Sequence, residues 1–261
     1  MRKINFTKMV AAGNDFVVIK DKISGNLPLL ARRMCDRKFG IGADGLLLLS
    51  KCKNADFRMR IFNADGSEAE MCGNGARCAA LFSAKKENKM LTLAGIVDAE
   101  VSGSRVKIRI TSPKCVRLDI PLMVNGRKIK VNFINTGVPH AVIFVSGLED
   151  ISVGQIGRLI RFHREFAPAG TNVNFVETGK NNLIRVRTYE RGVEGETLAC
   201  GTGSTASALI FALKNNSDNL VKVFTQSGEI LKVYFQNIHG LLKNVWLEGG
   251  AKIVYKGEYY V

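Results

Sequence analysis

Short stretches of alternating hydrophobic and polar residues run along most of the chain and predict many β-strands. In Phe57–Phe62, apolar residues at every second position alternate with arginines, and Leu183–Thr188 repeats the same pattern. Further strands are predicted at Phe16–Ile19, Leu46–Leu49, Val97–Val101, Val106–Ile110, Lys130–Ile134, Ala141–Val145, Val173–Val176, Ile230–Phe235 and Lys252–Tyr255.

Four segments have a helical pattern instead. Two of them, Leu29–Asp36 and Val153–Phe162, have polar positions on one side. The other two follow the motifs MCGNGARCAAL (residues 71–81) and ACGTGSTASALI (residues 199–210) and are apolar on nearly every side. A helix without a polar stripe is normally buried all round, so we expect each of these two to run through the middle of a curved sheet.

The order of these features repeats along the chain. AGNDFVVI, a helix, GIGADGLLLL, an alternating strand and Cys72 are followed by TGVPHAVIFV, a helix, AGTNVNFV, an alternating strand and Cys200. The distance from Gly13 to Cys72 is close to that from Gly137 to Cys200. The pattern indicates duplication, with a break between the halves near residues 111–114.

Composition limits the classes of protein to consider. The chain has 261 residues, enough for one large or two smaller domains, and its 46% hydrophobic content is sufficient for well-packed cores. There are 38 Lys and Arg residues against 23 Asp and Glu residues. Because the basic residues are scattered and no nucleic-acid-binding motif accompanies them, we expect a solvated basic surface and no nucleic-acid partner.

The location of the protein is also constrained by its sequence. The basic N-terminal stretch contains no apolar core of signal-peptide length, and every apolar run is too short to span a membrane. None of the six cysteines forms a Cys-x-x-Cys pair, and the three histidines are not clustered. We expect a cytoplasmic protein with reduced thiols, no membrane association and no metal site.

A cysteine directly before a helix has a specific chemistry. The N–H groups and dipole of a helix N-terminus stabilise a thiolate, and flanking glycines let those N–H groups approach a carboxylate. One such motif fits an acyl-transfer nucleophile, a redox thiol or only a tight turn. Pseudo-twofold packing of two related halves would place both thiols on opposite sides of one cleft, and this arrangement fits inversion at a carbon that bears hydrogen. One thiolate would remove a proton while the opposite thiol delivers one.

The two motif regions, FNADGSEAEMCGNGARC (residues 62–78) and YERGVEGETLACGTGSTA (residues 189–206), resemble those of diaminopimelate epimerases. The resemblance continues through KMVAAGNDFVVI, GIGADGLLLL, TGVPHAVIFV and GTNVNFVE and spans nearly the whole chain. It implies a cofactor-independent enzyme that interconverts LL- and meso-diaminopimelate, a precursor of lysine and peptidoglycan. It also suggests a homodimer.

The resemblance further implies an α+β fold of two pseudo-symmetric domains, each a curved mixed or antiparallel sheet wrapped around a central helix. Residues 1–114 would form the domain with Cys72, and residues 115–249 the domain with Cys200. Residues 250–261 would return as a strand to the first domain.

The same resemblance implies roles for individual residues. Cys72 and Cys200 become the base and acid pair, and His140 and Glu190 lie near the thiols and adjust their acidity. The reacting carboxylate would lie on the helix starts at Gly73, Asn74, Gly201 and Thr202. Further contacts to the amino and carboxylate groups of the substrate would come from Asn14, Asn63, Asn172, Glu190 and Arg191.

This chain departs from the family pattern at two positions. Val138 stands where many relatives have asparagine, and Gly45 stands where some have glutamine. Both departures reduce the polar contacts expected at the far end of the substrate. The cysteines outside the two motifs are expected to be structural: Cys35, Cys52, Cys78 and Cys115.

Two other enzyme functions remain compatible with the sequence. A proline or hydroxyproline racemase also uses opposed thiols, although the residues around both cysteines match the diaminopimelate branch better. In a thiol-based redox or acyl-transfer protein, Cys72 and Cys200 would act as nucleophiles. Exchange of the α-hydrogen with solvent distinguishes an epimerase from that second class.

Overall fold

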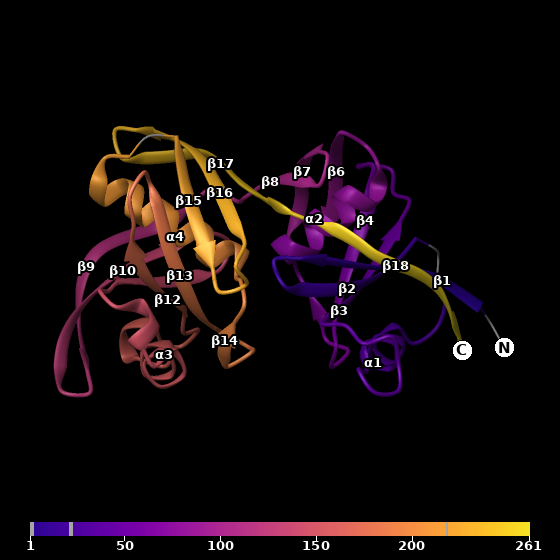
Figure 1. Ribbon diagram of the computed structural model, residues 1–261, viewed down its shortest axis with the longest axis horizontal. Helices are drawn as coiled ribbons and strands as arrows, with labels where there is room; N and C mark the ends of the chain where they lie inside the picture. The colour runs from indigo at the N-terminus through magenta and orange to yellow at the C-terminus, as the bar shows by residue number, and fades with distance from the viewer. Residues whose placement is uncertain (1–2, 21–22, 218) are drawn as a thin grey trace. The chain divides into compact units, whose positions relative to one another are not determined.

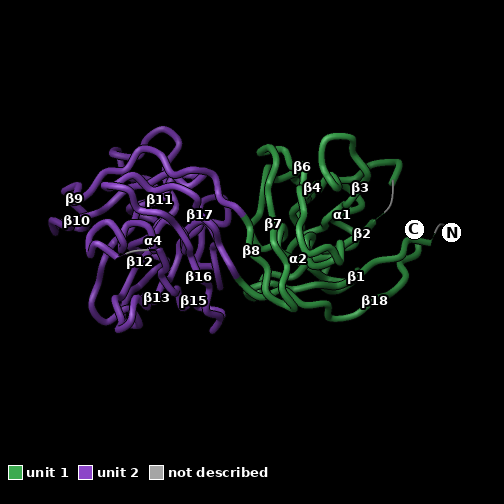
Figure 2. The backbone as a smooth tube through the Cα atoms, turned by 90° about the horizontal axis from the view of Figure 1, so that it is seen from above, with its two compact units in different colours: residues 1–108, 249–261 green, residues 109–248 purple. Residues whose placement is uncertain are grey.

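The computed structural model describes residues 3–20, 23–217 and 219–261. The chain folds into two units, residues 1–108 with 249–261 and residues 109–248 (Figure 2). Each unit is a mixed sheet around one helix, which confirms the predicted α+β class (Figure 1). No helix in the described ranges is long and apolar enough to cross a membrane.

The strands of unit 1 pair in the order β18–β1–β2–β3–β4–β6–β7–β8, with the short β5 on β4. The pairs β2–β3 and β4–β6 are parallel and the others antiparallel. The strand bounds are β1 Lys3–Ala11, β2 Asn14–Ile19, β3 Gly45–Ser50, β4 Phe57–Asn63, β5 Glu68–Ala69, β6 Glu87–Thr92, β7 Gly95–Ser102, β8 Arg105–Arg109 and β18 Lys252–Tyr260.

Unit 2 repeats this order as β9–β10–β11–β12–β13–β15–β16–β17, with β14 on β13. The parallel pairs, β11–β12 and β13–β15, fall at the equivalent places. The strand bounds are β9 Lys114–Val124, β10 Arg127–Asn135, β11 Pro139–Phe144, β12 Asn172–Thr178, β13 Leu183–Glu190, β14 Gly195–Thr197, β15 Leu220–Thr225, β16 Ile230–Ile238 and β17 Leu241–Gly250.

A central helix packs against the inner face of each curved sheet. Helix α2 (Gly73–Ser83) contacts seven strands of unit 1, β1–β4, β6, β7 and β18, and α4 (Gly201–Asn215) contacts six strands of unit 2, β10–β13, β15 and β16. A flat sheet could not bring so many strands against one helix, so both sheets curve around it. Residues 73–80 and 203–212 are buried, as their apolar composition predicted.

Helices α1 (Leu27–Cys35) and α3 (Val153–Arg161) match the other two predicted helices within two residues at each end. Both helices pack on strands of their own unit. Helix α1 packs on β3 and β4, and helix α3 packs mainly on β12 and β13. Two short 3₁₀ turns, Leu148–Asp150 and Arg164–Phe166, flank α3. The sequence pattern predicted eleven of the strands but not β1, β5, β6, β9, β14, β15 or β17.

Helix α3 approaches β13 closely through one glycine. A Cβ atom on Gly157 would lie 2.5 Å from Cβ and 2.7 Å from Cγ of Tyr189. Gly154 is in the same helix, but a Cβ there would have no neighbour within 4 Å. The two glycines therefore form a matched pair for measuring this contact.

We expect Gly157→Ala to lower the free energy of unfolding by about 1–3 kcal/mol, because the added methyl group must displace Tyr189 or the helix. Gly154→Ala should leave it unchanged or raise it by up to about 1 kcal/mol, since alanine favours a helix more than glycine does. Urea unfolding followed by fluorescence of the single tryptophan, Trp246 on β17 of the same unit, measures both. Equal stability of the two variants would contradict this account of the packing.

Candidate active site

Each motif cysteine caps the N-terminus of a buried helix. Cys72 is the N-cap residue of α2 (φ −138°, ψ 121°), and its Sγ accepts a hydrogen bond from Gly75 N–H at 3.5 Å. Cys200 has the same place in α4 (φ −109°, ψ 114°), with the nitrogen of Gly203 3.4 Å from Sγ. Since a helix N-terminus stabilises negative charge, both sulfurs lie where the thiolate form is favoured.

The second glycine of each motif allows the helix to pack closely on the sheet. A Cβ on Gly75 would lie 3.2 Å from Cδ2 of Leu47 on β3, and a Cβ on Gly203 would lie 2.3 Å from Oδ1 of Asn174 on β12. The predicted reason for these glycines was close approach to a ligand. The structure adds a second reason, which is contact between the first helical turn and a strand.

A short hairpin precedes each cysteine and is held by an arginine–glutamate pair. Arg60 on β4 donates from Nε and Nη2 to the two carboxylate oxygens of Glu68 on β5, both at 2.7 Å. Arg187 on β13 pairs with Glu196 on β14 in the same way, at 2.7 and 2.8 Å. Because each glutamate lies four residues before a cysteine, both two-pronged pairs fix the strand that leads into the helix N-terminus.

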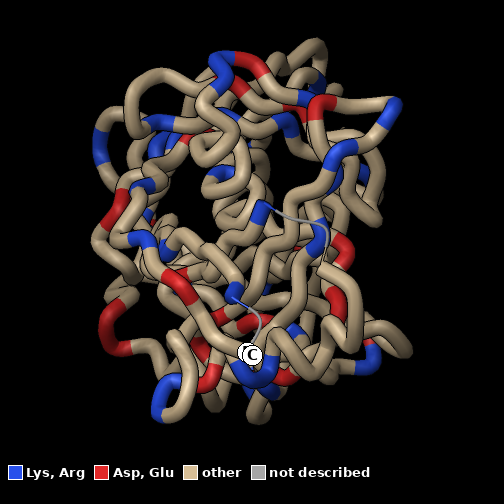
Figure 3. The backbone as a smooth tube through the Cα atoms, turned by 90° about the vertical axis from the view of Figure 1, so that its right-hand side faces the viewer, with Lys and Arg blue, Asp and Glu red and all other residues tan. Residues whose placement is uncertain are grey.

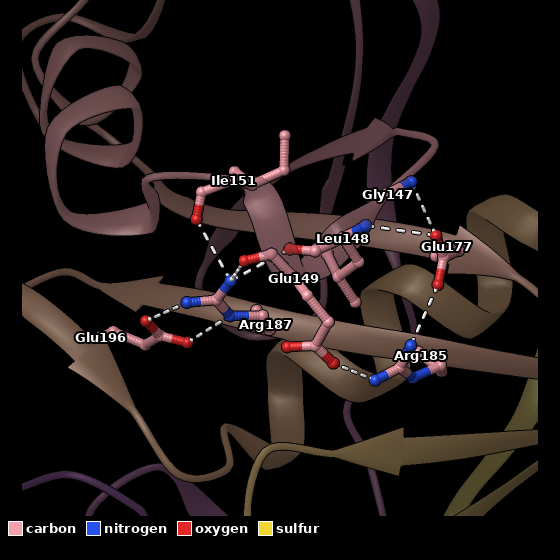
Figure 4. A network of polar contacts seen from close by, with 8 residues as sticks. All are labelled: Gly147, Leu148, Glu149, Ile151, Glu177, Arg185, Arg187 and Glu196. Atoms are coloured by element: carbon pink, nitrogen blue, oxygen red, sulfur yellow. Dashed lines mark hydrogen bonds and ion pairs between the residues drawn. The ribbon is translucent and has the colours of Figure 1, made fainter.

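Arg187 also holds the connection between β11 and α3 (Figure 4). Its Nη1 atom donates to the backbone carbonyls of Leu148, Glu149 and Ile151 at 3.0, 3.2 and 3.1 Å. The polar positions of this alternating strand therefore fix neighbouring segments in place.

The predicted residues of unit 1 lie at neighbouring strand ends. Asn14 begins β2, and Gly45 begins β3 opposite Asn63, the last residue of β4. Oδ1 of Asn14 is buried and has no hydrogen-bond partner within the described ranges, so it could accept a hydrogen bond from a ligand. Asn63 donates from Nδ2 to Ser67 Oγ at 2.9 Å, inside its own turn.

An ion-pair network supports the segment that carries Asn14. The backbone N–H groups of Asp15 and Asp44 each donate to the other's carboxylate, at 3.1 and 3.0 Å. Asp15 also pairs with the buried Lys8 at 2.7 Å and with Arg37 at 2.9 Å. Burial raises the pKa of Asp15, but hydrogen bonds from Arg37 and Lys8 outweigh it and hold that pKa well below its usual range. This carboxylate is therefore charged at neutral pH.

In unit 2 the predicted residues lie on the ends of β11, β12 and β13. His140 is opposite Asn172 in the β11–β12 register. Asn172 donates from Nδ2 to the carbonyl of Pro139 at 3.0 Å and accepts from the N–H of Arg191 at 2.8 Å. Its amide thus joins the start of β11 to the backbone of Arg191, which directly follows β13.

Glu190 and Arg191 differ in their surroundings. Burial raises the pKa of Glu190, although a hydrogen bond from Thr197 Oγ1 (3.0 Å) acts in the opposite direction. Arg191 is half-buried and donates from Nη1 to the carbonyl of Ala169 at 3.3 Å. One weak contact leaves most of its donors available to a carboxylate.

The predicted helix-start residues are the first two of each central helix, Gly73 and Asn74 in α2 and Gly201 and Thr202 in α4. The carbonyl of Thr202 accepts a hydrogen bond from Thr136 Oγ1 at 3.2 Å. Each unit therefore contains one motif cysteine at the N-terminus of its central helix, together with its own group of predicted contact residues. We call this set of residues the half-site of that unit.

Three buried polar residues of these half-sites were not predicted. Arg77 is fully buried on α2 and donates from Nη2 to Oδ1 of Asn74 at 2.7 Å. Asn174 and Thr188 lie under α4, hydrogen-bonded to each other at 3.0 Å. Two sequence signals were available. Arg77 is the single charged residue of helix α2, and Asn174 shares a strand face with Asn172.

Three cysteines outside the two motifs differ in burial. Cys35 and Cys78 are buried and Cys115 is exposed, and burial raises the pKa of Cys35 to about 11. Within the described ranges, no three His, Cys, Asp or Glu side chains are grouped so as to hold a metal ion. Basic and acidic residues are interspersed along the backbone (Figure 3).

Comparison with known proteins places the chain in a family. The family model described as "Diaminopimelate epimerase" matches residues 6–116 and 132–243. The diaminopimelate epimerase of Aquifex aeolicus (strain VF5) is 44% identical, with 98% of this chain and 97% of that protein covered. The enzyme of the same name from Hydrogenobaculum sp. (strain Y04AAS1) is 42% identical, with 96% of each chain covered.

Solved structures agree on the fold. A phenazine biosynthesis protein of the PhzF family from Bacillus anthracis matches with a TM-score of 0.78 at 18% identity, covering 100% of both chains. A probable proline racemase from Agrobacterium radiobacter K84 matches with a TM-score of 0.70 at 20% identity, covering 99% of this chain and 92% of that one. These two likenesses concern the fold alone, whereas the family model and the sequence relatives agree over nearly the full length. The chain belongs to the diaminopimelate epimerase family.

Proposed function

We propose that this protein interconverts LL- and meso-diaminopimelate through proton transfers by Cys72 and Cys200. The observation that carries the proposal is that both cysteines cap a buried helix N-terminus, each through a hydrogen bond to its sulfur. The family supports diaminopimelate as the substrate. In the proposed reaction the two thiols transfer the protons, and backbone N–H groups of the central helices stabilise the negative charge.

The proposed reaction keeps its atoms and electrons in balance. One thiolate takes the α-proton, and the electron pair of the broken C–H bond passes to the α-carbon and its carboxylate. The opposite thiol then gives its proton to the other face of that carbon, which inverts the configuration. Afterwards the first sulfur carries the proton and the second is the thiolate, so the next turnover starts from the opposite ionisation state.

The helix N-termini have a second task in this reaction. Negative charge grows on the reacting carboxylate as the α-proton leaves, and fixed N–H donors stabilise such charge without reorganising. We assign this role to the backbone of Gly73 and Asn74 in α2 and of Gly201 and Thr202 in α4. Inversion requires both thiols to reach opposite faces of one carbon, and a duplicated fold supplies one thiol from each copy.

The second amino-acid centre of the substrate needs its own partners. Arg191 has donors for a carboxylate, Glu190 can pair with an ammonium group, and Asn14 offers a buried acceptor. Asn63 and Asn172 complete the set that we assign to substrate binding. Val138 and Gly45 offer no side-chain hydrogen bond, so we expect some tolerance for altered far ends.

The racemase alternative predicts a different substrate on the same fold. It would be supported by turnover of proline or hydroxyproline, and the redox or acyl-transfer alternative by activity without α-hydrogen exchange. The homodimer, the cytoplasmic location and the lack of a nucleic-acid partner stay predictions. Gel filtration and a salt-dependent binding assay with DNA and RNA test the first and the last.

The first prediction concerns the two cysteines. Incubation of the protein with LL-diaminopimelate in deuterated water should give the meso isomer with deuterium at the inverted carbon. Cys72→Ala and Cys200→Ala should each abolish this conversion, since neither thiol can serve both faces. Cys115→Ala, at an exposed cysteine, is the matched control and should retain it. Near-normal epimerisation by either of the first two variants would rule out the two-thiol mechanism.

The second prediction follows from the raised pKa of Glu190. The carboxylate forms only above that pKa, so kcat/KM should fall as pH decreases through it, at a higher pH than for an ordinary glutamate. Glu190→Gln should lower kcat/KM and abolish its fall at low pH. Glu87→Gln, at an exposed position on β6, should leave that fall unchanged. An unchanged pH profile in Glu190→Gln would exclude the assigned role.

The third prediction tests recognition of the far end of the substrate. Arg191→Ala should reduce kcat/KM for LL-diaminopimelate by roughly one to two decades, the effect of losing a hydrogen bond of about 1.5–3 kcal/mol to a charged group. Arg127→Ala, at an exposed arginine, should have little effect. A substrate truncated at the far end should be affected much less by Arg191→Ala. Equal losses with both substrates would show that Arg191 does not recognise that end.

A further inference from the structure

Three buried polar side chains lie side by side on neighbouring strands of unit 2. His140 on β11 and Asn174 on β12 are 0% exposed, and Thr188 on β13 is 4% exposed. Asn174 also contacts the first turn of α4, because its Oδ1 lies 2.3 Å from the position that a Cβ on Gly203 would take. The group therefore lies directly beneath the turn that Cys200 caps.

The Asn174 amide has one orientation that satisfies its neighbours. A backbone carbonyl can only accept a hydrogen bond, so the amide atom 3.0 Å from the oxygen of Ala141 must be the donor, Nδ2. At the other end, Thr188 Oγ1 donates to Oδ1 at 3.0 Å. Both hydrogen bonds therefore require the same orientation of the amide. A flipped amide would place its oxygen against the carbonyl oxygen of Ala141, and both atoms are acceptors.

This orientation determines the protonation of the neighbouring imidazole. Nδ1 of His140 lies 3.2 Å from the same Nδ2 atom and must accept its second hydrogen, so the ring proton is on Nε2. Burial lowers the pKa of His140 to about 3, and the charge of Arg191 acts in the same direction. Nε2 is itself buried and has no hydrogen-bond partner within the described ranges.

We propose that Asn174, oriented by Thr188 and the Ala141 carbonyl, is a positioning residue that holds His140 as its neutral Nε2–H tautomer. The imidazole then serves the unit 2 half-site as a fixed hydrogen-bond donor to an anionic group of the bound substrate, and takes no proton itself. The donor role rests on the proposed function, whereas the tautomer does not. A ring that could not gain a proton would not compete with the thiols for the α-proton.

The equivalent place in unit 1 has no such group. By strand register, Phe16 on β2 corresponds to His140 and Leu47 on β3 corresponds to Asn174. Both approach Gly75, with Leu47 Cδ2 at 3.2 Å and Phe16 Cε1 at 3.6 Å from the position of its absent Cβ. The fixed donor therefore belongs to one half of the duplicated fold, which makes the surroundings of the two thiols chemically unequal.

The tautomer can be observed directly in the full-length protein. The chain has three histidines, so long-range ¹H–¹⁵N spectra of ¹⁵N-labelled protein resolve each ring, and a His140→Gln variant assigns the signals. We expect His140 to have a protonated Nε2 and an unprotonated Nδ1, unchanged between about pH 5.5 and 8.5. A protonated Nδ1, or titration of the ring within this range, would overturn the proposal.

Substitution of Asn174 tests whether this residue determines the tautomer of His140. Asn174→Asp replaces the Nδ2 donor with an acceptor, so the signals of His140 should change to those of a ring protonated at Nδ1. We expect kcat for LL-diaminopimelate to fall about tenfold, as for the loss of one hydrogen bond to a charged group, with a smaller change in KM. Thr188→Val, which removes the hydroxyl at similar volume, should partly release the amide and give a mixture of tautomers.

Asn132→Asp is the matched control. Asn132 is also buried, at 2% exposed, and donates to a β11 carbonyl, that of Val142, at 3.1 Å. The signals of His140 should not change in this variant. An unaltered tautomer in Asn174→Asp would refute the positioning role. If that variant does not fold, the wild-type and Thr188→Val spectra decide. A wild-type Nε2–H tautomer without epimerase activity would contradict the proposed function and leave the tautomer assignment in place.

Discussion

The arrangement of each unit depends on how a helix N-terminus is buried inside a sheet. The first N–H groups of such a helix have no partner in the helix, so another acceptor must approach them. In both central helices this acceptor includes a cysteine sulfur. The capping bond that permits burial is thus also the interaction that prepares the sulfur for chemistry.

The two units show how a duplicated fold can keep its framework while its two sites diverge. Strand order, parallel pairs, capping cysteines and the arginine–glutamate pair before each cysteine are shared. The side chains beneath the first turn of the central helix differ. They are Phe16 and Leu47 in unit 1 and His140 and Asn174 in unit 2. Framework positions determine where a sulfur lies, and the positions beneath it determine its electrostatic surroundings.

The sequence was informative for several elements along which burial follows a simple pattern, although β6 and β15 alternate in burial and were not predicted. Alternation predicted β4 and β13, and the apolar helices after the two cysteine motifs were buried as expected. It failed for β9, whose first residues are nearly all exposed and so have no burial pattern, and for β1, where the buried Lys8 pairs with Asp15. Arg77 and Asn174 were missed because a polar residue is expected at the surface until its partners are known.

Strand β18 pairs with β1 along nearly its whole length, although more than two hundred residues separate them in the sequence. Unit 2 is continuous in the chain, whereas the sheet of unit 1 needs a strand that follows unit 2. During synthesis, unit 2 can therefore complete its fold while unit 1 still lacks its last strand. The domain that begins first is the one that finishes last, and until then the unpaired edge of β1 is open to other strands.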